Sequence, residues 1–184
     1  MEKLVLIDGH SILNRAFYGV PNLTNSEGLH TNAVYGFLNI LFKVLDEEKA
    51  DYLAVAFDLK APTFRHKMFD AYKGTRKPMP EELHEQVPLM KEVLTAMGVP
   101  ILTKEGYEAD DILGTIAKRE QKDGYEVTIL SGDRDLLQLS DTHIRICLPK
   151  TSRGTTEVHN YYPEDVIREY QVTPEQFIEV KALM

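Results

Sequence analysis

The strongest constraint on the fold is the alternation of short apolar runs with segments of helical character. Apolar runs of strand length lie at 3–8, 52–58, 99–103, 125–133 and 143–149, and the segments with helical spacing or helix-start and helix-stop residues lie at 31–48, 80–98 and 108–124. A chain that alternates strand and helix forms a mainly parallel sheet with helices on both faces. The sequence therefore predicts an α/β fold.

The C-terminal part continues with a turn at Arg153-Gly154, a short strand within 151–159 and two helices that each open with proline followed by an acid. A chain of 184 residues suffices for one well-packed core, so we expect a single domain spanning 1–184.

Several features predict a cytoplasmic protein. The single cysteine, Cys147, lies in a strand-like run and cannot form an internal disulfide, which fits a reducing compartment. We find no signal peptide, and no apolar run approaches the roughly 18 residues that a membrane span needs. We therefore expect no membrane association.

Carboxylates cluster where the predicted strands end. Asp8 and Asp58 end the first two strands, Glu108, Asp110 and Asp111 open the helix after the third, and Asp133 and Asp135 follow the fourth. Each of these acids, taken singly, is an ordinary turn or helix-cap residue. However, the carboxyl ends of parallel strands share one edge of the sheet, so all seven are expected to converge on one crevice.

The chemistry of these side chains predicts the ion. No cysteine or His-x-x-x-His spacing accompanies the acids, which argues against zinc. Oxygen ligands suit Mg²⁺ or Mn²⁺, and seven acids exceed what one ion needs. We therefore expect a two-ion site of the kind that hydrolyses phosphodiesters.

The segment at about 60–80 is the most basic part of a chain whose net charge is −8. Its cations are Lys60, Arg65, Lys67, Lys73, Arg76 and Lys77, and Phe64, Phe69 and Tyr72 lie among them. Cations that hold phosphates and rings that stack on bases are typical of a contact with a nucleic-acid strand. A solvated surface loop is the alternative, but the neighbouring acidic crevice favours the nucleic-acid interpretation.

The motifs "VLIDGHSILNRAFY", "AVAFD", "FRH…YKGTRKPMPEEL", "GYEADDILGTIA" and "ILSGDRDLLQL" resemble the five-prime nuclease region at the N-terminus of bacterial DNA polymerase I. The resemblance covers the whole chain and extends more distantly to flap endonucleases. It implies a PIN-like (resolvase-like) fold and hydrolysis near DNA 5′ ends and flaps with two Mg²⁺ or Mn²⁺ ions. The implied partners are such DNA, RNA–DNA primers and the polymerase portion of the same polypeptide.

The resemblance also implies roles for individual residues. All seven acids would bind metal, Lys73 and Arg76 would act on the scissile phosphate, Tyr72 would stack, and Arg15 would lie near the DNA path. With Arg65 and Lys77 of the basic segment, the expected DNA contacts are Arg15, Arg65, Tyr72, Lys73, Arg76 and Lys77. The family continues with further metal acids and a helix-three-turn-helix motif, which this chain lacks, so we expect it to be weakly active or inactive.

Two other classes of function stay open at this point. An aspartate-nucleophile phosphatase or receiver-like domain also has acids at strand ends, but it would have Asp-x-Asp after the first strand, where this chain has Asp8-Gly9-His10. A non-catalytic fragment that only binds metal and DNA is the second alternative.

Overall fold

The computed structural model describes residues 1–75, 77–152 and 155–183. In these residues six strands form one sheet in the order β3-β2-β1-β4-β5-β6. The strands are β1 (Lys3–Asp8), β2 (Tyr52–Ala56), β3 (Ile101–Leu102), β4 (Glu126–Leu130), β5 (Ile144–Ser152) and β6 (Thr155–Tyr161). All neighbouring pairs are parallel except β5 and β6, which are antiparallel. The expected mainly parallel α/β fold is confirmed.

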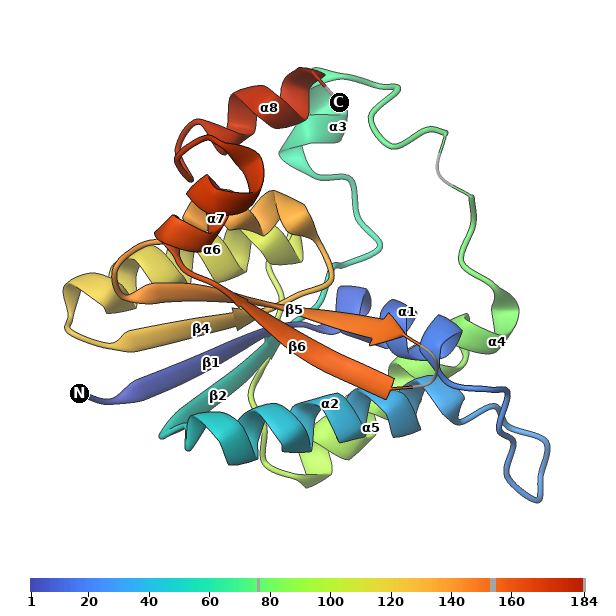
Figure 1. The fold of residues 1–184 in the computed structure, drawn as a ribbon. Coiled ribbons are helices and arrows are strands. Elements are labelled where there is room, and N and C mark those ends of the chain that lie inside the picture. The colour runs from blue at the N-terminus through green and yellow to red at the C-terminus, as the bar shows by residue number, and fades with distance from the viewer. Residues whose placement is uncertain (76, 153–154, 184) are drawn as a thin grey trace.

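Helices cover both faces of this sheet (Figure 1). One layer holds α1 (Gly9–Gly19), α2 (Asn32–Glu48) and α5 (Gln86–Ala96), and the opposite layer holds α6 (Ala109–Lys122), α7 (Pro163–Tyr170) and α8 (Phe177–Leu183). The shorter α3 (Phe64–Met68), α4 (Glu81–His84) and 3₁₀ helix η1 (Arg134–Leu139) lie in the connections. None of the helices in the described residues has the length and apolar character of a membrane span.

Each face of the sheet has its own apolar core. In β1, Val5 and Ile7 pack toward α1, α2 and α5, whereas Leu6 packs toward α6, because successive strand side chains point to opposite faces. All three are almost completely buried. Burial on both faces explains why the strands appear in the sequence as continuous apolar runs.

The expected elements differ from the observed ones mainly in their connections. The helix expected at 80–98 is divided at Glu85 into α4 and α5. Pro88 lies in the first turn of α5, where its missing N–H costs no helical hydrogen bond. The strand expected at 99–103 has only two residues, and the expected Arg153-Gly154 turn lies outside the described residues.

Candidate active site

The end of β1 connects directly to the acidic edge of the sheet. Asp8 is the last residue of β1 and caps α1, its Oδ1 accepting a hydrogen bond from the Ser11 N–H at 3.1 Å. Its Oδ2 accepts from the Ser131 hydroxyl at 3.0 Å, just beyond β4. Gly9 is required beside it, because a Cβ there would lie 2.6 Å from the Phe57 ring. Two strands and one helix therefore fix the position of Asp8.

The next acids come from the ends of β2 and the start of α6. Asp58 lies two residues beyond β2, and its Oδ1 accepts from the Ala109 N–H at 2.7 Å. The Asp58 N–H donates to His10 Nδ1 at 3.2 Å. This pair of bonds holds the first turn of α6, with Glu108 and Asp110, beside the ends of β1 and β2.

Asp133 completes the group from the β4 side. It lies three residues beyond the end of β4 and caps η1, with its Oδ1 accepting from the Asp135 N–H at 2.9 Å. Its own N–H donates to the Ser131 hydroxyl at 3.0 Å, the same hydroxyl that contacts Asp8. Ser131 thus links two acids, a role that the sequence analysis missed.

The mutual repulsion of these acids shows that they share one region. Burial, followed by the charges of Asp8, Asp133, Asp58 and Glu108, raises the pKa of Asp110 to about 8. Burial likewise raises the pKa of Asp8 to about 6, with smaller contributions from Asp58 and Asp133. Hydrogen bonds from Ser11 and Ser131 oppose the increase at Asp8. Four acids from four segments therefore repel one another at this edge.

The other three predicted metal acids have cationic partners. Asp111 receives two hydrogen bonds from Arg65, Glu108 contacts Lys73 at 2.5 Å, and Asp135 pairs with Lys181 of α8 at 2.7 Å. As placed, no three His, Cys, Asp or Glu side chains of the described residues are arranged to hold one ion. The seven acids share an edge, but they divide into a repelling group and a paired group.

The basic segment lies over this edge and contacts it. Tyr72 donates its hydroxyl to Glu108 Oε2 at 3.2 Å, and the ammonium of Lys73 lies 5.3 Å from the centre of the Tyr72 ring. Lys73 has a backbone φ of 58°, in the left-handed region that residues other than glycine rarely adopt. Two of the six side chains expected to contact DNA, Tyr72 and Lys73, are therefore directed at the acids.

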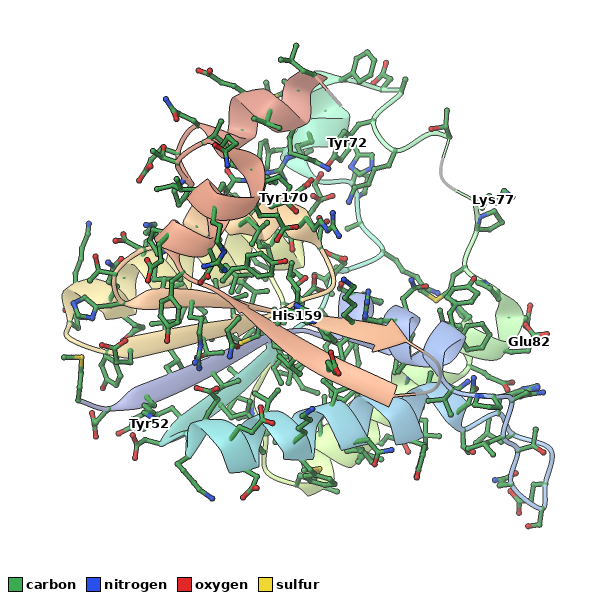
Figure 2. The ribbon with its side chains drawn as sticks, in the orientation of Figure 1. Tyr52, Tyr72, Lys77, Glu82, His159 and Tyr170 are labelled. Atoms are coloured by element: carbon green, nitrogen blue, oxygen red, sulfur yellow. The ribbon has the colours of Figure 1, made fainter. Side chains whose placement is uncertain are left out.

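The remaining predicted DNA contacts are distributed differently. Figure 2 shows Tyr72 on the α3 side of the segment and Lys77 on the stretch that leads toward α4, and Lys77 is exposed. Arg15 lies on α1, and its Nε is buried without a hydrogen-bond partner in the described residues. Arg76 lies outside the described residues, so its predicted role stays a prediction.

Comparison with known proteins identifies the family. A family model described as the N-terminal resolvase-like domain of 5′-3′ exonucleases matches residues 3–171. The chain belongs to this family. DNA polymerase I of Bacillus caldotenax and that of Bacillus subtilis (strain 168) are each 49% identical over 183 residues. Those residues span the whole of this chain but only 21% of each relative.

The fold of this exonuclease-family domain is also found in solved structures. The bacteriophage T5 flap endonuclease, solved as a pseudo-enzyme-product complex with DNA and metal ions, matches with a TM-score of 0.75 at 24% identity. The match covers 100% of this chain and 66% of that one. The expected PIN-like architecture is therefore confirmed.

The carboxylate oxygens at this edge of the sheet are suitable ligands for a hard divalent cation. Asp110 is half-buried and has no hydrogen-bond partner within the described residues, although several carboxylates surround it. Its ionised form therefore lacks a counter-charge, which a divalent ion bound by oxygen ligands would supply. The buried thiol of Cys147, on β5, plays no part here, and burial raises its pKa to about 12.

Proposed function

We propose that this chain is the nuclease domain of a metal-dependent 5′-nuclease, which hydrolyses phosphodiester bonds at DNA 5′ ends and 5′ flaps. The observation that carries the proposal is the convergence of Asp8, Asp58, Asp110 and Asp133 from four segments, beside a basic segment that contacts the same edge. Family membership supports the same activity.

In this proposal Mg²⁺ or Mn²⁺ is held by Asp8, Asp58, Asp110 and Asp133, with Glu108 and Asp135 nearby. When bound, the ions activate water and stabilise charge on the phosphate oxygens. Lys73 and Arg76 bind the phosphate and stabilise the charge that develops on it. Tyr72 stacks on a base, and the exposed ammonium of Lys77 binds the backbone.

The partners of this domain follow from the same proposal. The substrate is DNA with a 5′ end or flap, including RNA–DNA primers, and the ions are Mg²⁺ or Mn²⁺. The curated relatives are DNA polymerases about five times longer than the matched region, so we propose a polymerase portion in the same polypeptide. We also propose that residues 1–184 form one domain and that the protein acts in the cytoplasm.

The alternatives have less support. A phosphatase would need an accessible nucleophilic carboxylate after β1, but Asp8 is only 6% exposed and both of its oxygens accept hydrogen bonds. A fragment that only binds metal and DNA is separated from the nuclease by a cleavage assay.

The test uses a 5′-flap oligonucleotide with Mn²⁺ or chelator, incubated with this chain and with a longer chain that includes the sequence following residue 184. We expect metal-dependent cleavage that is weak or absent with this chain and faster with the longer one. In the longer chain, Asp133→Ala should lower the rate on the order of 100-fold or more and Lys73→Ala about 100-fold. Glu92→Gln, an exposed acid on α5, is the matched control and should leave the rate unchanged. Metal-independent cleavage, or none by either chain, would overturn the proposal.

A further inference from the structure

Neighbouring acids at the start of α6 have different surroundings. Adjacent helical residues point about 100° apart, so Asp110 and Asp111 cannot face the same ion equally. Asp110 lies among the other carboxylates at the strand ends, as their effect on its pKa indicates. Asp111 instead points toward α3 and the basic segment.

Both oxygens of Asp111 are occupied by hydrogen-bond donors. Arg65 donates from Nη1 to Oδ2 and from Nη2 to Oδ1, both at 2.7 Å. Oδ2 also accepts from the Glu108 N–H at 3.0 Å, which forms part of the capping box of α6. This two-bond arrangement is the strongest geometry available to an arginine and a carboxylate.

Arg65 is in turn held on its own side. Its guanidinium lies 4.5 Å from the centre of the Phe64 ring, and the Phe64 N–H donates to the Gly106 carbonyl at 2.9 Å. The Phe64 ring contacts that of Tyr107, with centres 5.7 Å apart. Thus α3 is fixed to residues 106–111 by a backbone hydrogen bond, a ring contact and an ion pair.

Beyond α3 the segment makes few such contacts. Met68 is 82% exposed and Phe69 is 65% exposed, and the chain next returns to the acids at Tyr72 and Lys73. The Tyr72 ring contacts the His66 ring of α3, with centres 5.1 Å apart, so the position of Tyr72 and Lys73 over the acids depends on the anchor as well as on their own bonds to Glu108.

We propose that Asp111 is a positioning residue and not a metal ligand: with Arg65 it anchors α3 and so places Tyr72 and Lys73 over the metal-binding acids. This inference rests on the proposed function. In it, Arg65 binds Asp111 and does not contact DNA. The two adjacent acids at the start of α6 therefore have different roles: Asp110 binds metal, and Asp111 holds the basic segment in place.

The first test is metal binding by calorimetry with Mn²⁺, which requires no nuclease activity. Asp111→Asn keeps an oxygen for the capping bond but removes the nearer of the two charges that pair with Arg65, whose Nη1 also lies 3.3 Å from Glu108 Oε2. We expect its Mn²⁺ dissociation constant to stay within about twofold of wild type, whereas Asp110→Asn weakens binding at least about tenfold. Equal weakening by both variants would overturn the proposal.

The second test is amide hydrogen exchange of residues 64–73. Asp111→Asn and Arg65→Gln should each increase exchange in this segment about tenfold while leaving β1 and β4 unchanged. Arg65→Lys keeps the charge but loses the forked geometry, so it should have an intermediate effect. Unchanged exchange at 64–73 in these variants would overturn the proposal, and circular dichroism with thermal melting checks that each has folded.

Discussion

At the scale of single residues, small side chains decide whether the acidic edge can form. Gly9 and Gly132 lie at the ends of β1 and β4, where the chain turns away from the sheet. A Cβ on Gly9 would lie 2.6 Å from the Phe57 ring, and one on Gly132 would lie 2.9 Å from the Ser11 hydroxyl oxygen. The acids at Asp8 and Asp133 are each next to a glycine because the neighbouring segments approach closely.

Gly9→Ala is expected to destabilise the fold by about 1–3 kcal/mol, since the Phe57 ring is fully buried and cannot move away without disturbing the core. Urea unfolding at neutral pH measures the change. Gly114→Ala in α6 is the matched control, because its Cβ would lie 3.3 Å from a flexible end of Leu139. There alanine should be neutral or stabilising by up to about 1 kcal/mol; equal losses for both variants would contradict the packing argument.

At the scale of elements, buried polar contacts fix how helices begin. Gln86 at the start of α5 is fully buried, and its Oε1 accepts from the N–H groups of Ala33 and Val34 at 2.8 and 3.2 Å. Its Nε2 donates to Asn32 Oδ1 at 3.0 Å and to the Glu82 carbonyl at 2.8 Å. The Gln86 side chain therefore bonds the free N–H groups in the first turn of α2 and links this turn to α4.

Gln86→Ala is expected to lower the free energy of unfolding by about 2–4 kcal/mol, because it leaves several buried hydrogen-bonding groups without partners. Chemical denaturation provides the measurement. The control is Gln171→Ala, since Gln171 is exposed and, among the described residues, its side chain bonds only the Arg168 carbonyl at its own helix end. A loss below about 1 kcal/mol for Gln86→Ala would show that water replaces these contacts.

A second element-scale contact predicts a dependence on pH. The Lys118 ammonium of α6 donates to Asp141 at 2.9 Å and lowers the pKa of that carboxyl from 3.8 to about 2. A carboxyl whose pKa is lowered by folding stabilises the fold at pH values above its pKa in the unfolded chain. This stabilisation is lost as the pH falls from about 4 toward 2.

Asp141→Asn should therefore be less stable than wild type at neutral pH and approach it near pH 2, as measured by urea unfolding at both. The neutral-pH difference should stay within about 1 kcal/mol, because the side chains of Lys118 and Asp141 are 45% and 38% exposed. Asp46→Asn, in the far more exposed pair with Lys49, is the control and should show little change. A difference that does not narrow in acid would refute the linkage.

At the scale of the whole molecule, the carboxylates at one edge of the sheet repel one another, and binding of a divalent metal ion reduces this repulsion. Mg²⁺ or Mn²⁺ at about 100 times its dissociation constant should raise the free energy of unfolding by about 2.7 kcal/mol. Thermal melting in chelator and in metal checks this. Asp110→Asn should melt higher than wild type in chelator at neutral pH, because the carboxyl of Asp110, whose pKa the fold raises to about 8, must take up a proton on folding and an amide need not. The variant should gain little from metal.

The exposed Glu92→Gln variant is the control for this measurement and should respond to metal as wild type does. Failure of metal to stabilise wild type would remove the physical basis of the metal site. Stabilisation of Asp110→Asn equal to that of wild type would instead show that Asp110 lies outside the site.

The amino-acid pattern was sufficient to predict the alternation of strands and helices, the mainly parallel sheet and the edge at which the acids gather. These features follow from local periodicity and from the rule that parallel strands end on one side. The sequence analysis missed α1 and α3 and the division of 80–98, because short helices and helix breaks depend on packing as well as on local pattern.

Which acids face one another and which have cationic partners depends on the packing of the folded chain. The contact between Arg65 and Asp111 joins residues 46 positions apart, so no local pattern could predict it. Likewise, the different directions of Asp110 and Asp111 depend on where α6 begins, which the bond between Asp58 and Ala109 fixes. The sequence supplies the charges, but pairing requires three-dimensional proximity, and only packing brings distant segments together.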